Sequence, residues 1–226
     1  MGANASGTVG GSRTLRYVVL AAMAVVTAVL VFAIPPDQTL GGLVRLVIFH
    51  GATTWVNLAT FTLAALLSAA FLVSGRLGLY WWASAFRYVS LPLWLMNAVL
   101  GVVSMRLAWG GFEWDEPRLR MTFVVLMAAL VVFAVDFLVG DRRLAAVLDI
   151  ALAGVLWYLL MTTHNLAHPD SPVFASGSTI VAIFLGLVVA CFVIAVVIAS
   201  LIRDRLARSA AGEEADGELE GTVEGA

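Results

Sequence analysis

The sequence predicts an all-α, polytopic membrane protein with six transmembrane helices. Of its 226 residues, 62% are hydrophobic and only 12% are charged, and the mean hydropathy is +0.98. A soluble domain has about 45–50% apolar residues. Six apolar runs can each cross a hydrocarbon core of ~30 Å, which takes about 20 helical residues. Lipid offers the backbone no hydrogen-bond partner, and no run alternates as a barrel strand does, so we expect helices.

Each run has its own boundary signals. Two prolines stop the first, whose apolar stretch exceeds the ~7–15 residues of a signal peptide, so we expect it to be retained. A Ser-Gly-Arg sequence ends the second, Pro92 lies near the start of the third, and a Gly-Asp pair closes the fourth. The expected spans are Tyr17–Ile34, Trp55–Val73, about Tyr88–Met105, Met121–Val139, about Leu144–Thr163 and Thr179–Ile202.

All thirteen basic residues are arginine, and their placement predicts the orientation. The positive-inside rule puts both termini in the cytoplasm. The chain then divides into a cytoplasmic tail (1–16), a membrane domain (17–202) with an external loop at about 106–120, and an acidic cytoplasmic tail (203–226) that we expect to be disordered. Inner segments carry Arg13, Arg16, Arg76, Arg87, Arg142, Arg143, Arg203, Arg205 and Arg208, and outer segments carry Arg45, Arg106, Arg118 and Arg120.

Composition and motifs exclude several classes of function. No basic patch supports nucleic-acid binding. The single Cys191 cannot form an internal disulfide. The chain shows no Ser/His/Asp order, Walker loop, CxxC or HExxH motif, so we do not expect an enzyme. Complete use of arginine and an acidic tail indicate a prokaryotic plasma membrane protein.

On this topology all three histidines fall on the outer side. His50 lies at the lipid–water boundary, where an imidazole can reach a cofactor, and histidine is the commonest nitrogen ligand of haem iron. It could equally bond a backbone carbonyl. His164 and His168 are four residues apart, and Pro169 indicates that the fifth helix stops near them. A zinc site would need a third strong ligand nearby.

The external loop combines aromatic, flexible and charged residues. Trp109, Gly110 and Trp114-Asp115 are followed by Arg118 and Arg120. Aromatic faces can stack on a porphyrin, glycine lets the backbone approach a flat ligand, and arginine pairs with carboxylates in forked geometry. The alternative is an interfacial aromatic belt, which membrane proteins commonly have.

Polar residues inside the spans are few. Asp136 and Asp149 lie near the inner ends of the fourth and fifth spans, where we expect them to pair with Arg142 and Arg143. Asn57, inside the second span, is expected to form an interhelical hydrogen bond.

Together these segments resemble the CcmC-type haem-handling proteins of cytochrome c maturation, which carry a tryptophan-rich "WWD" loop. That family's W-G-x-W-W-x-W-D loop and following R-L-T resemble residues 109–115 and 118–122. Its H-V-P-x-A-W is similar to the segment from His50 to Trp55, and its T-L-H-P/Q to residues 166–169. Phe112 and Glu113 replace tryptophans, Glu116 and Pro117 are inserted, and residues 51–52 depart from Val-Pro, so the chain resembles a divergent member.

The resemblance implies that haem b binds at the outer face and is presented to a membrane-anchored, CcmE-like haem chaperone, with an ABC transporter in the same pathway. His50 and His168 would ligate the iron, with His164 as the alternative second ligand. The other implied contacts are Trp55, Trp109, Gly110, Trp114, Asp115, Arg118 and Arg120.

Other classes remain open. Haem lyases of the same pathway use similar loops but are usually much longer. A b-type electron carrier usually holds its histidines within the spans. A small-molecule transporter without a cofactor would have broken helices and polar residues at the midplane.

Overall fold

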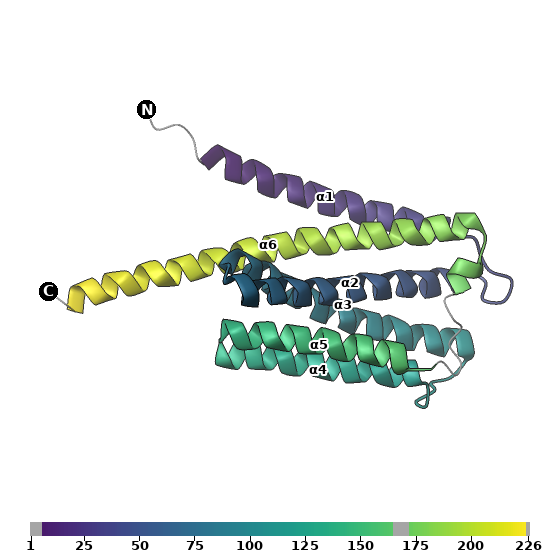
Figure 1. Cartoon of the computed structure of the whole chain (residues 1–226). Helices are drawn as coiled ribbons and strands as arrows, with labels where there is room; N and C mark the ends of the chain where they lie inside the picture. Colours follow the sequence, from purple (N-terminus) through teal and green to yellow (C-terminus); the bar gives the residue numbers. More distant parts are fainter. Residues whose placement is uncertain (1–5, 165–171, 225–226) are drawn as a thin grey trace.

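A computed structural model describes residues 6–164 and 172–224, and within them the backbone is helical apart from short connections and one isolated bridge between Asp37 and Gly41 (Figure 1). Six of the helices are long and apolar enough to span a membrane, so the predicted fold class is confirmed. The elements are α1 (Ser6–Ala33), α2 (Val44–Ser74), α3 (Leu77–Trp109), α4 (Pro117–Val139), α5 (Arg142–Thr162), the 3₁₀ turn η1 (Pro172–Ala175) and α6 (Ser178–Glu224).

Four helices extend well beyond the predicted apolar runs, and the first of them, α1, begins at Ser6 rather than at Tyr17. Helix α2 begins at Val44, eleven residues before the expected Trp55, and α3 begins at Leu77 rather than near Tyr88. The sequence also predicts an unstructured tail after residue 202, whereas the helical backbone of α6 runs to Glu224. Arginines and glycines interrupt the apolar pattern in these segments without interrupting the backbone hydrogen bonds.

The connections alternate between the two ends of the bundle (Figure 1). Residues 34–43 and 110–116, the end of α5 with residues 163–164, and η1 lie at one end, which we call the loop end. The two-residue connections, the start of α1 and the end of α6 lie at the other, which we call the terminal end. At the terminal end, Gly140 (φ 66°) closes α4 in a left-handed conformation and Asp141 caps α5 by accepting from the backbone N–H of Leu144 at 2.6 Å.

Helix α2 lies at the centre and packs against α3, α5 and α6. One core cluster contains residues of α2, α3, α4 and α5. Phe61 of α2 meets Trp94 of α3 edge-on at a ring distance of 5.8 Å, and Val125 of α4 and Leu156 of α5 are fully buried in the same cluster. The Trp94 indole N–H donates to the carbonyl of Thr122 at 2.9 Å, which joins α3 to α4.

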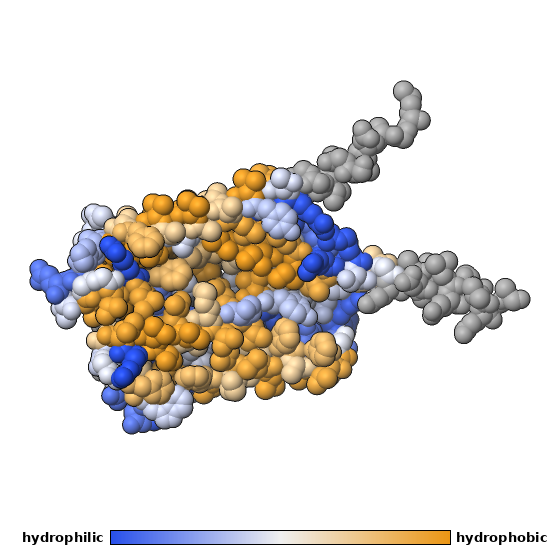
Figure 2. Space-filling model, turned by 180° about the vertical axis from the view of Figure 1, so that it is seen from behind, coloured by the Kyte–Doolittle hydropathy of each residue, from blue (hydrophilic) through white to orange (hydrophobic). Residues whose placement is uncertain are grey.

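Helix α1 is peripheral. It packs mainly along α6, and the apolar stretch that would cross the membrane is not buried within the protein. The contact depends on Gly186 of α6, because a Cβ there would lie 3.2 Å from Cδ1 of Leu30. On the face shown in Figure 2, apolar side chains cover the middle of the molecule and polar side chains gather toward its two ends, as expected for a membrane protein.

A buried ionic cluster links four helices. Arg87 of α3 donates to Asp149 of α5 and lies 2.5 Å from Asp136 of α4, and Ser68 of α2 donates to Asp149 at 2.7 Å. The expected pairing of Asp136 and Asp149 with Arg142 and Arg143 is therefore wrong. Arg87 is no loop charge either, since only 3% of its side chain is exposed. It lies ten residues into α3, about 15 Å along the helix axis.

Candidate functional site

The loop end gathers most of the residues that the sequence analysis singled out. The connection between α3 and α4 carries the aromatic loop, and the segment after α5 carries His164. Helix α2 also begins at this end, and His50 is its seventh residue. His168 lies outside the described residues. The arrangement follows from the topology, because every second connection of a helical hairpin array meets at the same end.

The sequence predicts that His50 precedes the second helical span, but the structure places His50 inside α2. Its imidazole is half-buried and faces Gly101 of α3, where an added Cβ would lie 3.1 Å from the ring atom Cε1. Its backbone carbonyl accepts from the hydroxyls of Thr53 and Thr54 at 2.9 and 3.0 Å. Gly101 therefore makes the space in which the His50 ring sits between the two helices.

A polar seam continues from His50 along the interface of α2 and α3. Thr53 donates to the side-chain oxygen of Asn97 at 2.8 Å, and both residues are buried. One turn further along α2, the amide of Asn57 donates to the carbonyl of Leu93 at 3.2 Å. The predicted interhelical role of Asn57 is confirmed. The seam sets how α2 and α3 face each other, because buried polar groups in lipid must find protein partners.

The aromatic loop spans residues 110–116 and starts from a left-handed glycine, Gly110, with φ 74°. Arg106 donates to the carbonyl of Gly110 at 2.7 Å and so holds the helix end. Trp109, Phe112 and Trp114 expose 39%, 47% and 57% of their surface. The rings of Phe112 and Trp114 are 5.2 Å apart, and Trp114 meets Phe123 of α4 at 5.3 Å. The rings of Phe112, Trp114 and Phe123 are thus in contact with one another, and Trp109, Phe112 and Trp114 are all exposed at this end of the bundle.

The charged residues of the loop mostly hold it together. Arg120 pairs with Asp115 and also donates to the carbonyl of Trp114 at 2.9 Å. Both side chains remain accessible, with 58% of Arg120 and 87% of Asp115 exposed. Glu116, by contrast, is almost fully buried where α4 begins. Arg120 already fixes the tryptophan backbone, so an acidic ligand would have to compete with Asp115 for it.

Trp55 contacts Phe174 of η1, whereas His50 faces Gly101 of α3. Trp55 and His50 are five residues apart on one helix, about 140° around its axis. Trp55 meets Phe174 of η1 edge-on at 6.5 Å, and Phe174 meets Phe184 of α6 at 5.8 Å. Phe174 is not among the residues predicted from the sequence, although an aromatic residue that follows a Pro-rich connection can indicate a segment folded back onto the bundle.

His164 follows the end of α5 by two residues and is exposed. Over residues 6–164 and 172–224, no group of three or more His, Cys, Asp or Glu side chains is placed to hold a metal ion. Axial ligation of a haem iron needs fewer, because the porphyrin supplies four of the six donors.

The fold and the loop end define a multi-pass membrane protein with an aromatic, histidine-bearing surface at one end of the bundle. The chain matches no protein-family model, and a search of curated proteins finds no match.

Proposed function

We propose that this protein handles haem for cytochrome c maturation, binding haem b at the outer membrane face and presenting it to a membrane-anchored, CcmE-like chaperone. The observation that carries the proposal is that His50, the exposed aromatic loop and the His164 segment share the loop end. Haem presentation requires an imidazole near the membrane boundary and a flat apolar surface that remains accessible to the acceptor. Both features are present at this end.

The donor chemistry fits the cofactor. The Nδ1 atom of His50 is buried, so Nε2 is the candidate ligating nitrogen. His168 would supply the second axial imidazole, with His164 as the alternative. Two neutral imidazoles leave a bound haem iron coordinatively saturated, which suits transfer of the cofactor rather than oxygen chemistry. The role of Trp109, Phe112 and Trp114 is to offer ring faces to the porphyrin, with Arg118 and Arg120 available for propionates.

The orientation completes the proposal. Arginine is more frequent at the terminal end even without the buried Arg87, which favours a cytoplasmic location for both termini and an external loop end. The setting would be a prokaryotic plasma membrane. An ABC transporter of the same pathway would act on the loaded chaperone.

The decisive test is the visible absorption spectrum of the detergent-purified protein, oxidised and then reduced. We expect a sharp reduced α-band of six-coordinate b-type haem. The H50A and H168A variants should each lose bis-imidazole ligation, and H164A serves as the matched control for a neighbouring histidine. If H164A loses ligation and H168A keeps it, the second ligand is His164. A colourless protein that also fails to bind added haemin contradicts the proposal.

A second candidate function, transport of a small molecule without a cofactor, is favoured by the ionic cluster of Arg87, Asp136 and Asp149. Ionisable side chains within membrane helices often mark transport or proton paths. The D136N variant separates the two functions. Haem-handling activity should survive this change as long as the protein folds, whereas coupled transport should be lost.

A further inference from the structure

A hollow of about 270 Å³ lies between α1 and α6 at the terminal end, away from the proposed haem site. The two helices diverge toward the chain ends (Figure 1). The aliphatic lining residues come from residues 198–202 of α6, and we call them the floor; the lining arginines lie farther toward the ends of the two helices, and we call them the rim. The lining residues of the hollow are Arg13, Tyr17, Ile198, Leu201, Ile202, Asp204, Arg205 and Arg208.

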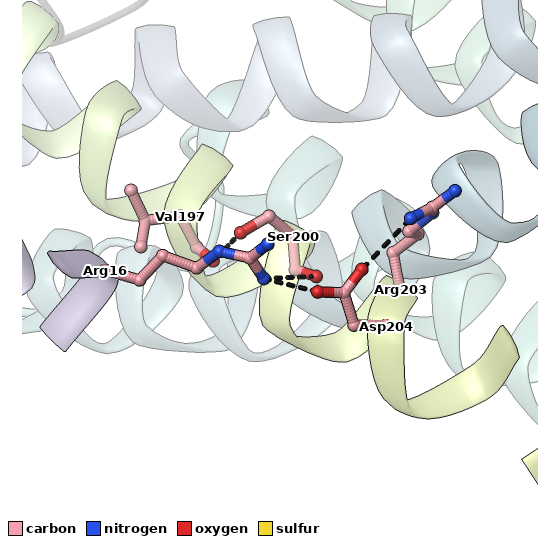
Figure 3. Close-up of polar contacts among 5 residues, drawn as sticks. All are labelled: Arg16, Val197, Ser200, Arg203 and Asp204. Atoms are coloured by element: carbon pink, nitrogen blue, oxygen red, sulfur yellow. Dashed lines mark hydrogen bonds and ion pairs between the residues drawn. The ribbon is translucent and has the colours of Figure 1, made fainter. Parts of the chain in front are cut away.

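The one acidic residue that lines the hollow, Asp204, is paired with arginines that lie beside the hollow. Asp204 is bound by Arg16 at 2.5 Å and by Arg203 at 3.0 Å, and Arg16 also reaches the carbonyl of Ser200 at 3.4 Å (Figure 3). The contacts of Arg16 cross from α1 to α6 and fix the register of the two helices. The carboxylate of Asp204 is thus neutralised by side chains outside the hollow.

The remaining arginines carry the charge of the hollow. Among the side chains that the structure describes, no ion pair engages Arg13, Arg205 or Arg208, and all three are exposed. Blue, hydrophilic surface gathers at this end of the molecule, next to the orange sides of the bundle (Figure 2). Among the described residues that line the hollow, three arginines therefore stand against a single acid, Asp204, which Arg16 and Arg203 already engage.

The hollow lies where the apolar parts of α1 and α6 end, which is where lipid headgroups are expected. The apolar part of α1 starts at Tyr17, which is 60% exposed, and the apolar part of α6 ends at Ile202. Arg203, the next residue, lies over the ring of Trp82 at 5.8 Å, and tryptophan marks the membrane–water boundary. The floor thus faces hydrocarbon, and the arginines stand where phosphates would be.

We propose that this hollow binds the phosphate headgroup of an anionic phospholipid in the leaflet at the terminal end. Arginine pairs with phosphate oxygens in forked, charge-assisted geometry. Basic pockets between transmembrane helices are a known mode of lipid recognition. The apolar floor favours a lipid over a free phosphate ion, because acyl chains can cover Ile198 and Ile202 while the headgroup meets the arginines. The site is independent of the proposed haem function.

The test compares two double variants of the full chain purified in mild detergent. R13Q/R205Q removes one rim arginine from each helix, and R76Q/R143Q removes two exposed arginines of the same end that lie outside the hollow. Binding of dioleoylphosphatidylglycerol is measured by native mass spectrometry, and dioleoylphosphatidylcholine, a zwitterionic lipid with no net charge, is the control. Each arginine near a surface contributes about fivefold in affinity, so R13Q/R205Q should bind phosphatidylglycerol about 30-fold more weakly than the wild type. R76Q/R143Q should bind it as the wild type does.

Three outcomes would overturn the proposal. Equal loss in the two double variants would mean a diffuse surface charge effect. Equal binding of phosphatidylcholine would remove the requirement for an anionic headgroup. If inorganic phosphate or glycerophosphoglycerol displaced the lipid at comparable concentrations, the hollow would be a site for a free anion and not for a lipid. Circular dichroism of R13Q/R205Q verifies that the variant is folded.

Discussion

Arg87 and Asp149 form a two-point ion pair inside the helix bundle, with Nε and Nη2 of the arginine 2.7 and 2.8 Å from the two carboxylate oxygens. Asp136 approaches the third guanidinium nitrogen, and Ser68 donates to Asp149. The cluster joins α2, α3, α4 and α5 at one point. A buried charge that loses its partner is costly, so this pairing selects one arrangement of the four helices.

Replacing Asp149 by Asn should therefore destabilise the fold more than replacing Asp136. Asp149 accepts two arginine hydrogen bonds and one from Ser68, whereas Asp136 makes a single contact and its side chain is 10% exposed. We expect D149N to lower the free energy of unfolding by about 3–5 kcal/mol. Equilibrium unfolding in detergent micelles measures it, with exposed E113Q as the control. A D149N protein as stable as E113Q would show that the pair does not hold the bundle.

The contact between His50 and Gly101 predicts that a larger side chain at position 101 destabilises the protein more than the same side chain at an open helical glycine. A leucine at Gly101 would collide with the imidazole, since even a Cβ there lies 3.1 Å from Cε1. Overpacking of this kind costs about 1–3 kcal/mol. The control is G154L, because Gly154 is also helical but has open space around it. Thermal unfolding should show a lower midpoint for G101L than for G154L. Equal midpoints would mean that the His50 ring can swing away freely.

The exposed aromatic loop predicts which tryptophan matters for cofactor retention. If the proposed function holds, W114A should retain less haem through purification than W81A. Trp114 lies on the loop end, whereas Trp81 lies at the terminal end with the Arg142 guanidinium 5.2 Å from its ring. The ratio of haem absorbance to protein absorbance measures retention. Equal ratios would reduce the loop to an interfacial aromatic belt.

The turn at Asp37 predicts a response to pH at the loop end. Its carboxylate accepts from the backbone N–H groups of Leu40 and Thr39 at 3.0 and 2.8 Å, and these bonds lower the pKa of Asp37 below its ordinary value. Because the pKa of Asp37 is lowered in the folded protein, its carboxylate stabilises the turn fully at any pH above the ordinary pKa of aspartate. This stabilisation is lost as the pH falls through the lowered pKa of the folded state. Protease cleavage within residues 37–41 should therefore rise only in acid. In D37A it should be high at every pH, and a wild-type profile in D37A would contradict the role of the carboxylate.

The sequence by itself determined that this is a six-helix membrane protein. Runs of about 20 apolar residues have no other stable state in lipid, and their even number puts both chain ends on one side. Local chemistry also identified Asn57 as an interhelical donor and the loop around Trp114 as an unusual surface. These conclusions depend only on the solvent and on neighbouring residues.

Only the tertiary structure decided which groups are partners. Arg87 looks like a loop charge in the sequence, because an isolated arginine in a membrane helix is expensive. Its main partner, Asp149, is 62 residues away along the chain, and the two meet only after α3 and α5 pack around α2. The start of α2 ahead of His50 and the hollow between α1 and α6 arise in the same way. The free-energy cost of burying polar groups is offset by contacts between helices, and helix packing, not a local sequence pattern, determines which groups make those contacts.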